Sequence, residues 1–299
     1  MPLVSFSQLM HEAGEGNYAV GYFESWDSTS LLAVADAAAL TRSPVLLGLS
    51  GLYLSHPDKL VRDPLSAYAA LGLEVCRQLS VPAALVYNES PDAPSVLEAA
   101  RLGFSLVMYS DEDLGPVTQQ ARVRKIADEA HQLGAAVEGE IRALPGMTSM
   151  LTMPVSDEPL TDIDVALEFV NETKVDALAV NLGQMHLHGR HRLDLDLERL
   201  RELNSVLDVP LVLHGASSVG KDDLKAAISL GIRKINVGSW LKQTYFETLR
   251  DTCKASAEDY NPYVVVGSGL EGDVLTAARL ALRDQVAELM VLFGSANKA

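Results

Sequence analysis

The sequence predicts an α/β fold of the (β/α)8 or TIM-barrel class, and three observations predict it. Short apolar runs alternate with longer amphipathic stretches along the whole chain. The apolar runs are continuous rather than interrupted by polar residues, which is typical of parallel strands buried on both faces. Eight such strand–helix units occur within 299 residues, a usual length for one closed barrel. An open, doubly wound sheet is the alternative arrangement of the same units.

The units follow one another without a linker or a change in composition. Ser28 or Thr29 can cap the first helix, and Pro94 suits the first position of the third. We expect one domain over residues 1–299, with a helical extension from about residue 260. The expected strands, each with its following helix, are 19–23 and 28–41, 45–49 and 64–79, 83–87 and 94–102, 106–109 and 117–133, 135–140 and 162–173, 177–182 and 196–207, 211–214 and 221–230, and 234–237 and 241–257, with more helix over 273–292.

Composition and charge exclude several classes of protein. The formal net charge is -16, so a nucleic-acid partner is not expected, because phosphate contacts need clustered cations. A small anionic substrate is not excluded, since it needs only one local cationic pocket. We find no basic segment followed by an apolar run at the N-terminus, and no run of about 18 apolar residues. The two cysteines, Cys76 and Cys253, suggest no disulfide framework. We therefore expect a cytoplasmic protein without a membrane partner.

Polar residues recur where the expected strands end. The active sites of such barrels lie at the carboxyl ends of the strands, so these residues predict one polar pocket. Two of them, His186 and His214, follow consecutive strands, and imidazoles placed in this way can reach one metal ion. The residues at the strand ends are Glu24, Ser50, Asn88, Glu89, Ser110, Asp111, Glu138, Glu140, His186, His188, His214 and Asn236.

Two loops of small residues come after the last two strands. One is His214-Gly215-Ala216-Ser217-Ser218, and the other is Asn236-Val237-Gly238-Ser239. Small residues let backbone N–H groups and a hydroxyl approach a phosphate at the start of a helix. Barrels often bind phosphate at these two positions, and Arg190 in the preceding loop can add a cation.

From roughly Phe6 to Phe246, the chain resembles the class II fructose-bisphosphate and tagatose-bisphosphate aldolases. The stretches that carry the resemblance are 81–85, 103–108, 176–180 and 212–215, together with the spacing from Gly183 to Leu193-Asp194 and Leu200. The resemblance implies a TIM barrel, with His186 and His214 as zinc ligands. It also implies that Gly215, Ser217, Asn236 and Ser239 hold the substrate phosphate or backbone, and Arg190 falls where the family often has Lys; we add Ser50 to this set.

Several positions depart from the family pattern. The motif after the third strand is typically His-Leu-Asp-His-Gly, in which the Asp is an acid/base and the second His binds zinc. Here Asn88 replaces that Asp and Glu89 replaces that His. Glu140 is kept, but the Gly-Gly-Glu-Glu of the loop after it is absent. The strand-one end contains Glu24, and Gly238 replaces the Asp of the phosphate-side motif.

These departures lead to a modified site. We expect Glu89, His186 and His214 to bind a divalent metal, zinc first, with manganese or cobalt as alternatives and His188 as a possible substitute for His186. Since an amide such as Asn88 cannot exchange a proton as a carboxylate does, another group must act as acid/base. We expect Glu24 in this catalytic role, beside Asn88 and Glu140; Glu138 and Asp111 are further carboxylates. Alternatively, Glu24 forms a salt bridge with Arg142 or Arg190.

The expected function is a metal-dependent aldolase-type carbon–carbon lyase. Its substrate would be a ketose phosphate or related sugar derivative, and the changed strand ends predict one other than fructose 1,6-bisphosphate. Two alternatives stay open: related enediolate chemistry, such as transaldolase-like transfer or isomerisation, and a non-catalytic sugar-phosphate-binding partner subunit. A homodimer or homotetramer is expected from the family and from the long C-terminal helical region.

Overall fold

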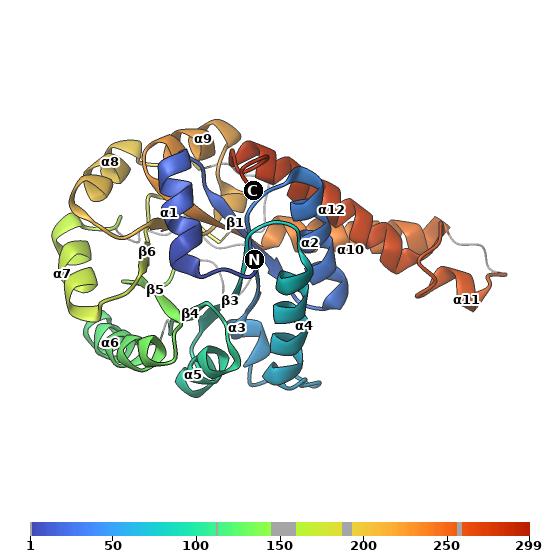
Figure 1. Cartoon of the computed structure of the whole chain (residues 1–299), viewed down its shortest axis with the longest axis horizontal. Helices are drawn as coiled ribbons and strands as arrows, with labels where there is room; N and C mark the ends of the chain where they lie inside the picture. The colour runs from blue at the N-terminus through green and yellow to red at the C-terminus, as the bar shows by residue number, and fades with distance from the viewer. Residues whose placement is uncertain (1, 112, 145–159, 187–192, 256–258) are drawn as a thin grey trace.

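Eight parallel strands close into a barrel in the order of the sequence (Figure 1). The computed structural model describes residues 2–111, 113–144, 160–186, 193–255 and 259–299. The closed barrel confirms the predicted fold, and pairing of β1 with β8 excludes the open sheet. The strands are β1 Val20–Ser25, β2 Val45–Ser50, β3 Ala83–Ser90, β4 Leu106–Tyr109, β5 Ala136–Glu140, β6 Ala177–Ala179, β7 Leu211–Leu213 and β8 Ile232–Val237.

The helices surround the barrel, and the main helix of each predicted strand–helix unit lies close to its expected range. The α-helices are α1 Phe6–Gly16, α2 Ser28–Thr41, α3 Gly51–Leu54, α4 Leu65–Gln78, α5 Ala93–Leu102, α6 Pro116–Gln132, α7 Ile163–Thr173, α8 Leu197–Val206, α9 Lys221–Ser229, α10 Ser239–Ala255, α11 Pro262–Val265 and α12 Val274–Leu292, with a 3-10 turn, η1, at Ala216–Ser218. Local capping explains several starts; for example, Asp27 accepts the backbone N–H of Ser30 at the start of α2.

Helix α1 closes the amino-terminal end of the barrel and was not expected from the sequence. Its apolar residues, Phe6, Leu9, Met10 and Ala13, are buried in one cluster with the inward-facing residues of the strands. Their spacing of three and four residues is a helical pattern that the sequence does contain. Because α1 closes that end, the opposite end of the barrel is left for ligands.

Alternation along the strands determines what fills the barrel. Apolar residues such as Val20, Leu46 and Val86 fill its lower layers. Glu138 on β5 and Lys234 on β8 also point inward, and both are 0% exposed. Charged residues are almost never buried unless they are paired, so this pair indicates a polar network just below the mouth of the barrel.

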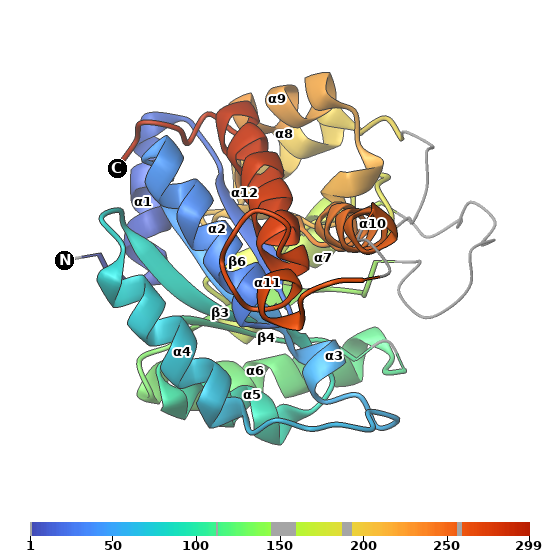
Figure 2. The ribbon, with the colours of Figure 1, turned by 90° about the vertical axis from the view of Figure 1, so that its right-hand side faces the viewer.

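The C-terminal helices form an arm on one side of the barrel. Helix α12 packs against α2 and α10, and α10, α11 and α12 extend away from the strands, with α11 at the far end (Figures 1 and 2). Large apolar side chains are exposed near the tip: Tyr260, Tyr263, Val266 and Leu270. Across the described part of the chain, every helix is too short or too polar to cross a bilayer.

Candidate active site and metal centre

A bulge in β3 shapes the candidate site. Tyr87 pairs with Val107 and Ser90 with Tyr109, so β3 has one more residue than β4 over this stretch. Glu89 takes up the extra residue with a φ of 45°, a left-handed conformation that costs an ordinary residue about 1–2 kcal/mol. Asn88 and Glu89 therefore line the same cavity at the barrel mouth, although successive strand residues normally face opposite sides.

Glu89, His186 and His214 come together as expected from the sequence. One ligand atom from each lies within 4.8 Å of the others. His214 Nδ1 is 2.6 Å from Glu89 Oε1, and His186 Nε2 is 3.9 Å from the same oxygen. Two imidazoles and one carboxylate supply three ligand atoms, and divalent metals bind such a set of donors.

The state of His214 Nδ1 tests whether a metal fits here. This nitrogen is buried and has no hydrogen-bond partner among the described residues, despite its short distance to Glu89. The other ring nitrogen, Nε2, lies 2.7 Å from Glu138 Oε1. An Nε2–H donated to Glu138 leaves the lone pair of Nδ1 directed at the cluster, as in carboxylate–histidine–metal arrangements. The residues therefore fit a metal ion.

Lys234 continues this network and was not singled out from the sequence. Its Nζ lies 2.8 Å from Glu138 Oε2 and donates to Asn236 Oδ1 at 2.5 Å. Asn236 Nδ2 in turn donates to Asn88 Oδ1 at 3.3 Å. A lysine inside an apolar strand was the available signal. The chain of contacts ties Asn88 to Glu138 through two side chains of β8.

The charges in this network shift one another's pKa values. Burial raises the pKa of Glu89, but His214, His186 and Lys234 outweigh it and lower the pKa to about 2. Burial opposes protonation of His214, yet Glu89 and Glu138 raise its pKa to about 10. These shifts favour a positive charge on His214 between two carboxylates, and Nδ1 would have to lose its proton before its lone pair could bind a metal.

Glu140 occupies a second position at the mouth of the barrel. It is buried, receives a hydrogen bond from the hydroxyl of Ser110, and lines one cavity together with Glu89 and His186. Burial is the main cause that raises the pKa of Glu140 to about 7, and Glu89 and Glu138 add to it. A carboxyl group with such a pKa can exchange protons near neutral pH. Asp111, another expected carboxylate, lines the same cavity.

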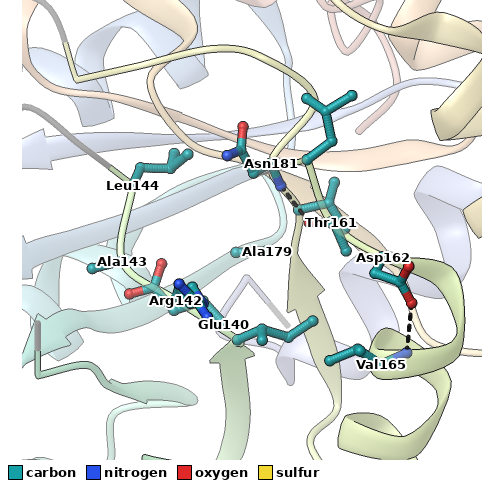
Figure 3. Close-up of a pocket in the computed structure, with 12 residues that line it drawn as sticks. Glu140, Arg142, Ala143, Leu144, Thr161, Asp162, Val165, Ala179 and Asn181 are labelled. Carbon is teal, nitrogen blue, oxygen red and sulfur yellow. Dashed lines mark hydrogen bonds between the residues drawn. The ribbon is translucent and has the colours of Figure 1, made fainter. Parts of the chain in front are cut away.

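The other side of Glu140 faces a neighbouring cavity between β5 and β6 (Figure 3). Arg142 also lines this cavity, and the backbone N–H of Asn181 donates to Thr161 Oγ1 at 2.7 Å. This hydrogen bond joins the segment that follows β6 to the segment that precedes α7.

Glu24 forms a salt bridge, but with a partner that the sequence did not suggest. Its Oε1 contacts Lys242 Nζ from the first turn of α10, rather than Arg142, while Arg190 lies outside the described residues. Burial raises the pKa of Glu24, and Lys242 lowers it in part. The ammonium of Lys242 also lies 3.7 Å from the centroid of the Tyr53 ring and 5.8 Å from that of Trp26.

The expected phosphate-binding residues gather around the cavity that Asn88 and Glu89 line. Gly215, Ser217, Asn236 and Ser239 line it with Glu24 and Lys242. Gly215 has a φ of 63°, and a Cβ there would meet the carbonyl oxygen of Met185 at 2.7 Å, so this close turn requires glycine.

Two further expectations have different outcomes. Ser50 is buried at the end of β2, beside Asn88 in the strand register, and its hydroxyl has no hydrogen-bond partner among the described residues. Arg190 and His188 lie outside the described residues, so their expected roles stay predictions.

Comparisons with known proteins agree with this fold and identify a family. The sequence model of class-II fructose-bisphosphate aldolases matches residues 4–298. A sulfofructosephosphate aldolase of Alkalicoccus urumqiensis is 28% identical over 100% of this chain and 99% of its own length. A fructose-bisphosphate aldolase of Thermus caldophilus is 28% identical over 99% of this chain and 100% of its own length.

Solved structures show the same fold. The YdjI aldolase of Escherichia coli K12 has a TM-score of 0.79 at 24% identity, covering 99% of both chains. A putative fructose-1,6-bisphosphate aldolase of Coccidioides immitis has a TM-score of 0.81 at 24% identity, covering 97% of this chain and 96% of that one. The fold and the polar barrel mouth define a TIM-barrel lyase of the aldolase type. The chain belongs to the class-II fructose-bisphosphate aldolase family.

Proposed function

We propose that this protein is a metal-dependent aldolase that cleaves or forms a carbon–carbon bond in a ketose phosphate or related sugar derivative other than fructose 1,6-bisphosphate. The observation that carries the proposal is the cluster of Glu89, His186 and His214 at the mouth of the barrel. The replacement of the family's acid/base Asp by Asn88 supports a different substrate. One relative is named for sulfofructosephosphate rather than fructose bisphosphate.

We propose zinc as the metal, held by Glu89, His186 and His214, with manganese or cobalt as substitutes. When bound, the metal supplies Lewis-acid polarisation of the substrate carbonyl. Glu138 holds the His214 ring in the orientation that exposes Nδ1, and Lys234 holds Glu138.

Glu140 is the proposed proton acceptor and donor. Its carboxyl group lines the cavity that also contains Glu89 and His186, and its pKa of about 7 allows both protonation states at neutral pH. Glu24 is the other carboxylate expected in this role, but its Oε1 is held by Lys242. Asn88, which accepts a hydrogen bond from Asn236, is assigned the orientation of a substrate hydroxyl rather than proton transfer.

Gly215, Ser217, Asn236 and Ser239 are the proposed binding residues for the phosphate end of the substrate, and Ser50 and Arg190 are proposed as further binding residues. Backbone N–H groups at the start of α10 and in η1 favour an anion at this place. With its phosphate bound there, the substrate would extend its reacting carbons toward Glu89 and Glu140, which line the neighbouring cavity at the barrel mouth.

We also propose that the protein forms a homodimer or homotetramer through its C-terminal arm. The exposed apolar side chains of Tyr260, Tyr263, Val266 and Leu270 form a surface that a second copy could cover. Sedimentation equilibrium of the full chain tests this directly, since a monomer at micromolar concentration would contradict it.

The central experiment is an assay of the purified protein with and without a strong chelator. Fructose and tagatose bisphosphates are compared with ketose monophosphates, and metal content is measured by mass spectrometry. We expect cleavage of a monophosphate that is lost on chelation and restored by zinc. Robust cleavage of fructose 1,6-bisphosphate, or activity that chelation leaves intact, would overturn the proposal.

A further inference from the structure

The salt bridge between Glu24 and Lys242 lies inside the substrate cavity rather than on the protein surface. Both residues line it together with Ser217 and Ser239. Among the described residues that line this cavity, Lys242 is the only lysine or arginine. Its side chain keeps 36% of its exposure, so the ammonium can contact a ligand without moving the helix that carries it.

The aromatic rings of Tyr53 and Trp26 hold the ammonium in place. Nζ lies 3.7 Å from the Tyr53 ring centroid and 5.8 Å from that of Trp26, both within the range of a cation–π contact. A lysine restricted in this way loses less conformational entropy when an anion binds. Lys242 is therefore already positioned for an anionic group.

Glu24 competes with any anion for this ammonium. Its Oε1 contacts Nζ, while its Oε2 lies where a side chain at position 238 would begin: a Cβ on Gly238 would be 2.4 Å from it. Gly238 does not have a positive φ, so its backbone conformation does not require glycine. The missing side chain instead leaves room for the Glu24 carboxylate. The position of the Glu24 carboxylate therefore depends on a glycine at residue 238.

Building on the function proposed above, we propose that Lys242 binds the terminal oxyanion of the substrate, a phosphate or a sulfonate. We further propose that Glu24 is an internal competitor that limits how much negative charge this end can carry. Repulsion by Glu24 grows with ligand charge, so it disfavours a dianion more than a monoanion. The pair is a specificity determinant and takes no part in proton transfer.

The test measures binding of two small probes to the metal-loaded protein at pH 8, by titration of tryptophan fluorescence. Methyl phosphate is a dianion and methanesulfonate a monoanion at this pH. We expect Glu24→Gln to tighten methyl phosphate by roughly 10-fold and methanesulfonate by roughly 3-fold. Lys242→Met should abolish saturable binding of both. Control variants on the same helix, Glu247→Gln and Lys254→Met, should leave both constants unchanged.

Gly238→Ala provides an independent variant, because its Cβ displaces the Glu24 carboxylate without changing any charge. It should tighten methyl phosphate in the same direction as Glu24→Gln. Unchanged binding in Glu24→Gln, an equal or larger gain for methanesulfonate, or saturable binding in Lys242→Met would each overturn the proposal. Since the probes bind without turnover, failure of the aldolase function would be seen separately, as metal-independent or absent cleavage.

Discussion

Glu138 offers the sharpest test of how this site is built, through the substitution Glu138→Gln. Its two carboxylate oxygens face two donors, His214 Nε2 at 2.7 Å and Lys234 Nζ at 2.8 Å. Glutamine has nearly the same shape but presents one oxygen and one NH2 group. One donor must therefore face another donor inside a site where all three side chains are 0% exposed.

Two separate losses are expected from this variant. A misoriented His214 should weaken metal binding by about 10–100-fold, the usual effect of removing a partner that orients a ligand. Lys234 would keep Asn236 as an acceptor but lose its counter-charge, and an uncompensated buried charge costs about 3–5 kcal/mol. That cost is a large part of a typical stability of about 5–15 kcal/mol.

The two losses can be measured independently. Competition with a chromophoric chelator gives the metal affinity, and urea denaturation of the metal-free protein gives the free energy of unfolding. The double variant Glu138→Gln/Lys234→Met removes the uncompensated ammonium, so it should recover most of the stability while metal binding stays weak. Glu172→Gln on the exposed side of α7 is the matched control. If Glu138→Gln bound zinc as tightly as the unaltered protein, the proposed orientation of His214 would be refuted.

Three further outcomes are expected. The rate of cleavage should increase with pH through about 7, because the ionised form of Glu140 is the base and its pKa is raised by burial and by Glu89 and Glu138. Glu140→Gln should remove this increase and lower kcat by about 10²–10⁴-fold. A pH–rate profile that stays the same in the variant would exclude Glu140 as the base. Metal binding should release one proton below pH 10, since the pKa of His214 is about 10 before the metal binds. The metal affinity should therefore increase about tenfold per pH unit in this range. Calorimetry in buffers of different ionisation enthalpy measures the released proton, and finding none would contradict the prediction. Ser218→Ala should weaken metal binding several-fold without loss of fold. The Ser218 hydroxyl accepts the backbone N–H of Met185 at 3.3 Å and donates to the carbonyl of Gly215 at 2.8 Å, so it links the residues beside His186 and His214. Equal metal affinities of the variant and the unaltered protein, measured by chelator competition, would show that this link does not position the ligands.

Alternating apolar and amphipathic segments were sufficient to predict the barrel. Buried parallel strands need continuous apolar runs, and helices need an apolar stripe, so both leave periodic signals in the sequence. Helix α1 left such a signal in Phe6, Leu9, Met10 and Ala13, and it was missed because it precedes the first strand–helix unit. Its role as a plug emerges only from packing against several strands.

The sequence by itself determined which residues gather at the mouth of the barrel. Every parallel strand of a closed barrel ends at the same rim, so Glu89, His186 and His214 were expected at this rim once the strands were located, and the family resemblance grouped them as metal ligands. The same reasoning placed Glu24 and Glu140 at this rim.

Tertiary structure alone decided which of these groups interact and in what state. The bulge that brings Glu89 into the cavity depends on the register between β3 and β4. Lys242 reaches Glu24 across 218 residues, and Lys234 pairs with Glu138 inside the barrel. Such contacts depend on side-chain directions and on burial, which set the strength of each charge interaction, and neither is encoded in local periodicity.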